Sequence, residues 1–340
     1  MKKSFLTAAF TLGVTLQPAQ GQDFTAAEAH ARLGIEAAEG QYLGYASLCD
    51  LEARIRNVNL PKQRKPANAK QGERRPTNGY RPKPTHIPAT LVFDNLWFLG
   101  TASTTTWLYG TEEGYVLIDG LTTDSQAQKY VIEGMEAAGL SPSAITAILV
   151  THGHGDHYGG ADYLAERLGV EILMSQKDWD LVATLGVHPR FGAPPRTGGI
   201  VEDGDVLRSG SSEMTIHLTP GHTPGTVSPI FKVHDGDNQH VAMLWGGTGF
   251  NFGPDVEIFQ TYADSVQKMR GIAKASGVDV FLSGHPRRDG SVKLLAQLSS
   301  RTDDAAHPFV RGAGGYALFD VLEHCALAQA ERFLPQSDKR

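Results

Sequence analysis

The sequence predicts a layered α/β domain over residues 86–334. The first observation is a set of short apolar runs bounded by glycine or polar residues, a pattern typical of strands; the runs occupy residues 114–119, 145–150, 170–174, 214–218, 240–245 and 278–282. The second is that stretches with the apolar spacing of a helix lie between some of these runs, one ending at Gly139 and another at Gly277. Clustered strands with interspersed helices favour a layered domain.

The overall composition excludes several other classes of protein. Of the 340 residues, 41% are hydrophobic and 20% are charged, which is ordinary for a globular protein and excludes disordered, collagen-like and coiled-coil architectures. The two cysteines exclude a disulfide-dense scaffold and a cysteine-based zinc finger, so any metal site must depend on histidine and carboxylate ligands. A net charge of −6 provides no general attraction to nucleic acid or membrane.

Residues 1–21 have the pattern of a cleaved export signal. Lys2 and Lys3 precede an apolar run over residues 5–16, and small residues follow up to Gly21. A membrane-anchoring helix is the alternative, but the run is shorter than the about 20 residues that span a bilayer, and no later stretch reaches that length. We therefore expect a periplasmic or secreted protein that starts near Gln22 and has no membrane association after cleavage.

Residues 22–85 are predicted to form an N-terminal helix and a basic connection. Residues 24–46 have helical composition, whereas residues 51–84 contain ten Lys or Arg, two Glu and five Pro. Such a segment cannot build a core and is expected to be extended. The segment carries a charge of +8 and the signal carries +2, so the net charge of −6 leaves −16 on the rest of the chain. The basic segment could therefore lie across this acidic body. Binding of nucleic acid or an anionic surface is the alternative. Because Tyr80 is its one aromatic residue, we expect no specific nucleic-acid partner. Residues 335–340 are expected to form a tail.

The sequence leaves the pairing of the two cysteines open. Export would place Cys49 and Cys325 in an oxidising compartment, where neighbouring thiols pair. Because sequence does not show whether these two residues lie close together, a disulfide and two separate buried thiols are both compatible with it.

A cluster of histidines follows the apolar run at residues 145–150. Residues 151–160 read THGHGDHYGG, with three histidines and one aspartate within six positions. Glycines at a strand-to-helix turn free the backbone, so that His152 and His154 can face one point while Asp156 and His157 face another. Structural zinc sites are closed by four ligands and rarely surround such a turn, so the cluster predicts two adjacent catalytic metal sites.

Two further histidines have similar surroundings. His222 lies in the turn TPGHTPG at residues 219–225, and His285 lies in SGHP at residues 283–286. Both follow predicted strands, as the first cluster does, so both are expected to be metal ligands. The remaining histidines are expected not to be ligands: His30, His86, His188, His217, His234, His240, His307 and His324. Histidine and carboxylate ligands suit zinc, iron or manganese, and export favours zinc.

This pattern of HxHxDH after a strand, a GHTPG turn and a strand-terminal histidine resembles the metallo-β-lactamase superfamily. Within it, the sequence is most similar to class B metallo-β-lactamases of the third subgroup, on residues 96–120, 203–205, 219–225 and 307–316. The likeness covers roughly residues 86–333 and implies a four-layer αββα sandwich. The basic segment lies outside it.

The resemblance also implies a site and a reaction. It implies two Zn²⁺ ions per chain, one bound by His152, His154 and His222, the other by Asp156, His157 and His285. The implied enzyme is a secreted dinuclear zinc hydrolase that opens a β-lactam amide of a small-molecule substrate by attack of metal-bound hydroxide, and so confers antibiotic resistance. Asp156 would orient that hydroxide as the catalytic residue. The alternative is a lactone, ester or thioester hydrolase of the same superfamily.

One absence distinguishes among relatives. Thioesterases, lactonases and nucleases of this superfamily use a further aspartate that bridges both metals, after the strand corresponding to residues 240–245. Here residues 246–251 read GGTGFN, and no carboxylate occurs before Asp255, which favours a β-lactamase-like site. Thr248, near the usual position of a serine, and Asn251 are candidate substrate contacts.

The walls of the pocket are expected to be loops around residues 100–108, 186–200 and 246–256. Trp107, Phe191 and Phe250 could line it, although each is more commonly a packing residue.

Overall fold

The computed structural model describes residues 23–60, 85–302 and 304–334. The predicted signal at residues 1–21, most of the basic segment and the tail at residues 335–340 lie outside this described part. Among the residues described, no helix is long and apolar enough to cross a membrane.

Two β-sheets form the centre of the fold. The first has seven strands in sequence order: β1 (His86–Phe93), β2 (Leu96–Thr101), β3 (Thr105–Thr111), β4 (Gly114–Ile118), β5 (Ile145–Leu149), β6 (Glu171–Ser175) and β7 (Gly199–Val201). The second has five, in the order β12-β11-β10-β9-β8: β8 (Val206–Ser209), β9 (Ser212–Thr215), β10 (Ile230–Asp235), β11 (Asn238–Trp245) and β12 (Val280–Ser283). Neighbouring strands are parallel from β4 to β7 and between β11 and β12, and antiparallel elsewhere.

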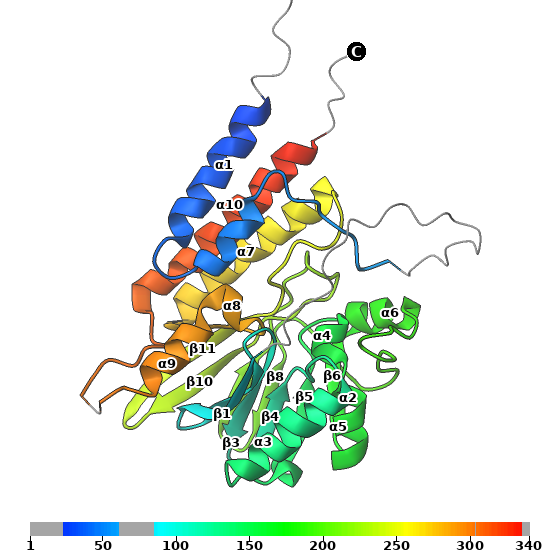
Figure 1. The fold of residues 1–340 in the computed structure, drawn as a ribbon, viewed down its shortest axis with the longest axis vertical. Helices are drawn as coiled ribbons and strands as arrows, with labels where there is room; N and C mark the ends of the chain where they lie inside the picture. Colours follow the sequence, from blue (N-terminus) through cyan, green and yellow to red (C-terminus); the bar gives the residue numbers. More distant parts are fainter. Residues whose placement is uncertain (1–22, 61–84, 303, 335–340) are drawn as a thin grey trace, which may run out of the picture.

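Helices cover the outer face of each sheet, which gives four layers (Figure 1). The first sheet is covered by α2 (Asp124–Gln126), η2 (Ala127–Ile132), α3 (Glu133–Ala137) and α5 (Ala161–Leu168). The second is covered by α1 (Asp23–Ala38), α7 (Val256–Ser276) and α10 (Ala317–Phe333). One hydrophobic cluster, around Trp107, Phe231 and Leu282, lies between the sheets, and a further cluster lies beneath each helical layer. The predicted αββα sandwich is confirmed.

Most predicted strands and helices are present. Gly169 and Gly277 end α5 and α7 with φ values of 70° and 69°, a left-handed conformation that glycine adopts without steric cost. The prediction of a loop at residues 100–108 is wrong for most of that range: Gly100 of β2 pairs with Thr105 of β3, which leaves only a short turn. Threonine and aromatic residues at 105–107 favour the strand. The other described helical segments are η1 (Leu43–Cys49), η3 (Pro142–Ala144), α4 (Gly155–Tyr158), α6 (Gln176–Thr184), α8 (Pro286–Asp289), α9 (Ser291–Leu298) and η4 (Gly312–Tyr316).

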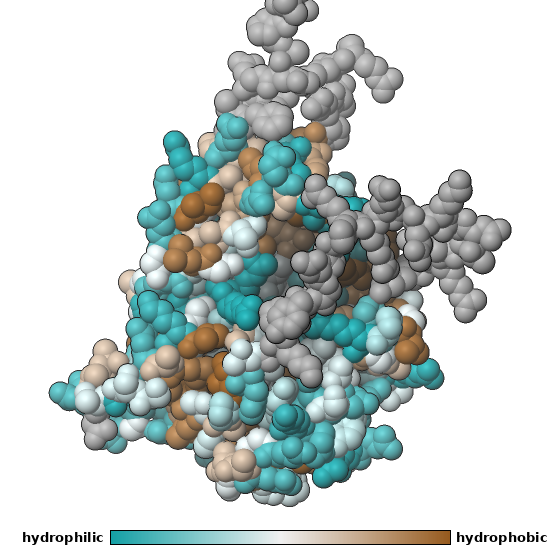
Figure 2. Space-filling model, in the orientation of Figure 1, coloured by the Kyte–Doolittle hydropathy of each residue, from teal (hydrophilic) through white to brown (hydrophobic). Residues whose placement is uncertain are grey.

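The N-terminal helix α1 packs on the helical layer above the second sheet. Its residues Ala31 and Ala38 belong to the same hydrophobic cluster as α7 and α10. Cys49, at the end of η1, forms a disulfide with Cys325 of α10, which settles the alternative that the sequence left open. Figure 2 shows hydrophobic residues on the surface over α1, where Leu33 and Ile35 are 42% and 45% exposed.

Residues 51–60, the first part of the basic segment, pack on this body. Leu51 and Ile55 are partly buried against the hydrophobic cluster around α7 and α10. Arg332 of α10 donates a hydrogen bond to the carbonyl oxygen of Ala53 over 2.9 Å. The interpretation of residues 51–84 as a connection that contributes to no core is therefore corrected for this part, because its apolar side chains find a partner surface far away in the sequence.

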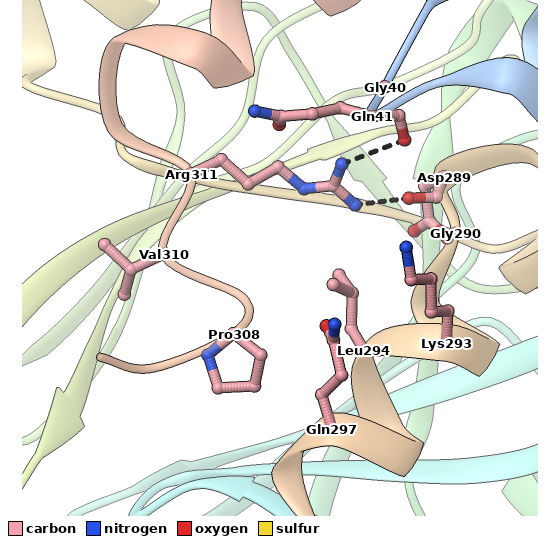
Figure 3. A pocket seen from close by; sticks show the side chains of 10 residues that line it. All are labelled: Gly40, Gln41, Asp289, Gly290, Lys293, Leu294, Gln297, Pro308, Val310 and Arg311. Carbon is pink, nitrogen blue, oxygen red and sulfur yellow. Dashed lines mark hydrogen bonds between the residues drawn. The ribbon is translucent and has the colours of Figure 1, made fainter. Parts of the chain in front are cut away.

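A cavity of about 210 Å³ lies where the turn after α1 meets α9 and the segment before η4 (Figure 3). Arg311 donates hydrogen bonds to the carbonyl oxygens of Gln41, over 3.2 Å, and Asp289. The guanidinium also lies 4.5 Å from the centre of the Tyr42 ring. Arg311 thus fastens the turn after α1 to the end of α8, the short helix that follows β12.

Candidate metal centre

The six candidate ligands lie in segments that follow strands of both sheets: His152, His154, Asp156 and His157 after β5, His222 after β9, and His285 after β12. They form two groups, each with its ligand atoms within 4.8 Å of one another. We call His152, His154 and His222 the three-histidine group, and Asp156, His157 and His285 the Asp156 group. The ring centres of His152 and His157 lie 4.0 Å apart, so the two groups are adjacent.

The geometry of the three-histidine group fits a zinc ion. The Nε2 atom of His222 lies 3.1 Å from Nε2 of His152 and 3.0 Å from Nδ1 of His154. Tetrahedral zinc with bonds to nitrogen of 2.0–2.1 Å would place the nitrogens about 3.3 Å apart. All three side chains are buried, and small shifts would admit the ion.

The Asp156 group is more open. The Nε2 atoms of His157 and His285 lie 3.1 Å apart, and Oδ2 of Asp156 lies 3.9 Å from Nε2 of His285. His157 is buried, whereas the side chains of His285 and Asp156 are 25% and 32% exposed. A carboxylate and two imidazoles form a donor set that zinc accepts, and solvent or a substrate can reach it from this exposed side.

The glycines of the cluster are required by packing rather than by unusual torsion angles. Neither Gly153 nor Gly155 has a positive φ value. A Cβ atom at Gly155 would lie 2.3 Å from the ring of Phe191, and one at Gly153 would lie 2.9 Å from Val182. The expectation that these glycines free the backbone is therefore corrected, and Phe191 packs against the metal-binding turn.

Asp119 is a site residue that the sequence interpretation missed. It follows β4 with a φ of 72°, and its Oδ2 atom lies 2.7 Å from Nδ1 of His157. Its Oδ1 atom accepts a hydrogen bond from the backbone N–H of Thr151 over 2.8 Å. The sequence offered one signal for this role. Asp119 directly follows the apolar run at residues 114–118, just as the histidine cluster follows the next apolar run, at residues 145–150. Such a carboxylate orients a histidine ligand and fixes its tautomer.

Asp178 connects two loops that carry candidate ligands. Its buried carboxylate accepts hydrogen bonds from the backbone N–H groups of Gly153 and Gly225, both over 2.8 Å, and from the hydroxyl of Thr223 over 2.7 Å. These contacts fasten the first histidine cluster to the turn that contains His222. Nothing in the local sequence around Asp178, within α6, predicts this role.

Two backbone carbonyls support further histidines. The carbonyl oxygen of Gly249 lies 2.6 Å from Nδ1 of His222, and that of Ser103 lies 3.1 Å from Nδ1 of His285. The segment after β11 therefore contributes a carbonyl where relatives are expected to have a bridging carboxylate. Asp255, the next acidic residue, instead caps α7 by accepting hydrogen bonds from the N–H groups of Glu257 and Ile258.

Burial and neighbouring charges set the protonation of the two groups. Burial holds the pKa of His152 and of His222 well below the usual range and lowers the pKa of His154 to about 4. Burial acts to raise the pKa of Asp156, but the His157 and His285 imidazoles more than offset it and bring that pKa well below its usual range. The three-histidine group therefore offers neutral imidazoles, and Asp156 offers an ionised carboxylate, which are the forms that bind metal.

The other residues that the sequence suggests for the substrate pocket lie in different parts of the structure. Trp107 is buried between the sheets and donates a hydrogen bond to the carbonyl oxygen of Ser283 over 3.0 Å, and Phe250 packs in an aromatic cluster with Phe252 and Phe259. Both are packing residues. Thr248 is buried, and the half-buried Asn251 has an Oδ1 atom without a hydrogen-bond partner; their contact with substrate stays a prediction. In the described part of the chain, the candidate metal groups include none of the eight histidines expected not to be ligands.

Comparison with known proteins shows which family part of the chain resembles. Residues 99–235 match the model of the metallo-beta-lactamase superfamily. Among curated relatives, a hydroxyacylglutathione hydrolase of Bradyrhizobium sp. (strain ORS 278) is 30% identical over 46% of this chain and 56% of its own length. Exodeoxyribonuclease YycJ of Bacillus anthracis is 26% identical over 55% of this chain and 61% of its own length. The chain spans roughly a third to three fifths of the length of the curated relatives it matches.

Solved structures with a similar fold are also metallo-beta-lactamases. The native FEZ-1 metallo-beta-lactamase from Legionella gormanii superposes with a TM-score of 0.63 at 21% identity, over 71% of this chain and 94% of that one. BJP-1, a subclass B3 metallo-beta-lactamase of Bradyrhizobium japonicum, gives a TM-score of 0.58 at 24% identity, over 70% and 91%. The chain is therefore similar to the metallo-beta-lactamase superfamily over residues 99–235, and it has the fold of solved metallo-beta-lactamases.

Proposed function

We propose that this protein is a dinuclear zinc hydrolase that opens the amide of a β-lactam. The observation that carries the proposal is the pairing of a three-histidine group with the adjacent Asp156 group, without a carboxylate from residues 246–251 between them. Solved structures with this fold, FEZ-1 and BJP-1, are metallo-beta-lactamases.

The two groups would hold one zinc ion each. Zinc, when bound, polarises a carbonyl oxygen and lowers the pKa of a coordinated water to about 7. The chain contributes Asp156, whose carboxylate is ionised and partly exposed, so it can accept a hydrogen bond from the attacking water and orient it. The buried residues Asp119 and Asp178 keep the ligands in place through their hydrogen bonds.

Turnover of nitrocefin and a carbapenem by the purified, zinc-loaded protein tests this function. We expect hydrolysis by the wild type and loss of at least a hundredfold in His154→Ala, which removes a ligand of the three-histidine group. His234→Ala, at a histidine outside both groups, is the matched control and should keep wild-type rates. Absence of turnover across several β-lactam classes would reject the β-lactam substrate.

A thioester, ester or lactone is the second candidate substrate. It is supported by the similarity to hydroxyacylglutathione hydrolases, whose name specifies a different acyl substrate. Assays with acyl-glutathione thioesters, aryl esters and acyl-homoserine lactones at the same zinc loading distinguish the two candidates by their values of kcat/KM.

We also propose that the protein is exported to the periplasm or secreted, where it protects the cell from β-lactams. The signal pattern at residues 1–21 and the Cys49–Cys325 disulfide support export. Fractionation of cells that express the full chain should place the protein outside the cytoplasm, with an N-terminus near Gln22. Deletion of residues 2–21 should leave it in the cytoplasm and abolish any increase in β-lactam resistance.

A further inference from the structure

We propose that Asn59 is a positioning residue of the metal centre, an inference that rests on the proposed zinc-binding function. Its Oδ1 atom lies 2.6 Å from Nε2 of His154, and its Nδ2 donates a hydrogen bond to the carbonyl oxygen of His222 over 3.0 Å. One side chain thus contacts two members of the three-histidine group, 95 and 163 residues away in the sequence.

These contacts specify the tautomer of His154. The donor to the His222 carbonyl must be the amide nitrogen of Asn59, so its oxygen faces His154 and can only accept. The proton of His154 therefore lies on Nε2, and the lone pair lies on Nδ1. That Nδ1 atom is 3.0 Å from Nε2 of His222, at the centre of the group. Asn59 thereby presents the metal-binding nitrogen of His154.

The segment that carries Asn59 is held by backbone hydrogen bonds. The backbone N–H of Val58 donates a hydrogen bond to the carbonyl oxygen of Asn251 over 2.8 Å. The backbone N–H of Gly253 donates one to the carbonyl oxygen of Arg56 over 3.1 Å. Residues 56–58 therefore lie antiparallel to residues 251–253, just after Gly249, whose carbonyl supports His222. The backbone N–H of Asn59 also donates to Oδ1 of Asn57 over 3.0 Å. Asn59 has a defined position although it lies in an irregular segment.

The role is distinct from the other supports of the histidines. Asp119, Ser103 and Gly249 lie within the catalytic domain, whereas Asn59 precedes both the family match at residues 99–235 and the region of family resemblance. His154 has no other hydrogen-bond partner at Nε2 among the described residues. The N-terminal segment therefore completes a site whose ligands all come from elsewhere.

Zinc affinity of three variants tests the proposal, measured by competition with a chromophoric chelator. Asn59→Ala removes both contacts and should weaken zinc binding by the three-histidine group about 10–100-fold. Asn59→Asp keeps an acceptor for His154 and should recover most of that loss. Leu60→Ala, at the neighbouring 61% exposed residue, is the matched control and should equal the wild type.

A second readout separates positioning from folding. The visible absorption spectrum of the cobalt-substituted protein should change in Asn59→Ala and return in Asn59→Asp, whereas the far-ultraviolet circular dichroism spectrum of the zinc-free protein should be the same in all four proteins. Zinc affinity of Asn59→Ala within twofold of the wild type would overturn the proposal, as would an equal loss in Leu60→Ala. Zinc binding without any turnover by the wild type would instead reject the proposed function and leave the role of Asn59 intact.

Discussion

At the scale of single residues, the candidate histidine ligands share one feature: one ring nitrogen faces the metal position and the other contacts a support. His157 pairs with Asp119, His285 with the carbonyl of Ser103, and His222 with the carbonyl of Gly249. Supports of this kind fix the tautomer and ring orientation, so they influence metal binding without touching the metal.

Replacement of Asp119 by alanine should weaken zinc binding in the Asp156 group by about 10–100-fold, because His157 loses the partner of its Nδ1 atom. The buried N–H of Thr151 also loses its acceptor, which should cost about 1–3 kcal/mol of stability. Calorimetric zinc titration and thermal denaturation measure the two effects. Asp237→Ala, at an exposed aspartate, is the control; full zinc affinity in Asp119→Ala would contradict this prediction.

The zinc-free protein should lose stability as the pH falls from 7 to 5. The pKa of His154 is lowered by burial from 6.5 to about 4, so over this range the unfolded chain takes up a proton that the folded chain does not. This one residue should cost roughly 2 kcal/mol at pH 5. His152, His222 and His285 act in the same direction, while the raised pKa of His157 opposes them.

Thermal midpoints of the metal-free protein at constant ionic strength measure this dependence. His154→Gln, which cannot be protonated, should show a smaller decrease between pH 7 and 5 than the wild type. A midpoint that does not change with pH in the wild type would contradict the prediction.

At the scale of secondary-structure elements, the turn between β5 and α4 is arranged by close packing with the loop at residues 186–200. Phe191 lies directly against Gly155, and its ring stacks on His188 with centroids 4.4 Å apart. The turn and the loop are therefore in close contact, and the loop contributes to the shape of the metal centre.

Gly155→Ala should displace this loop or the turn, because the added methyl group would lie 2.3 Å from the Phe191 ring. Overpacking of this kind typically costs about 1–3 kcal/mol and should also weaken zinc binding. The double variant Gly155→Ala with Phe191→Ala should recover much of the loss in Gly155→Ala, whereas Gly271→Ala, at a position with free space, should be tolerated. Thermal denaturation of the wild type, these three variants and Phe191→Ala measures the coupling, and additive effects of the two single substitutions would argue against it.

At the scale of the whole molecule, the N-terminal region packs on the same body as the two sheets and their helices. The disulfide between Cys49 and Cys325, the Gln329 hydrogen bonds to the carbonyls of Leu48 and Asp50, and the docking of residues 56–58 form one continuous connection to the metal centre. The disulfide closes a loop that contains nearly the entire fold.

Substitution of both cysteines by serine should lower the free energy of unfolding by about 2–5 kcal/mol, because the unfolded chain is no longer constrained by the long loop. Chemical denaturation with and without a reductant measures the effect, with the double variant as its own control for the reductant. Equal stability of the wild type in both conditions would contradict the prediction.

Whether a feature could be predicted from the sequence depends on how far apart along the chain the interacting residues lie. The strand at residues 145–149, the helix end at Gly277 and the six candidate ligands were predictable because apolar spacing, capping residues and motif spacing are local properties of the chain. Local patterns were misleading at residues 100–108, where a predicted loop is mostly strand, and at residues 51–60, where a presumed connection is docked.

The sequence by itself determined the fold class, the family resemblance and the positions that could bind metal. Only the tertiary structure decided that the two groups lie side by side, that Cys49 meets Cys325, and that Asn59, Asp119 and Asp178 support the site. The physical reason is that two side chains separated by tens or hundreds of residues come into contact only through the way in which sheets and helices pack. Packing buries apolar surface from the whole chain at once, and no local pattern records it.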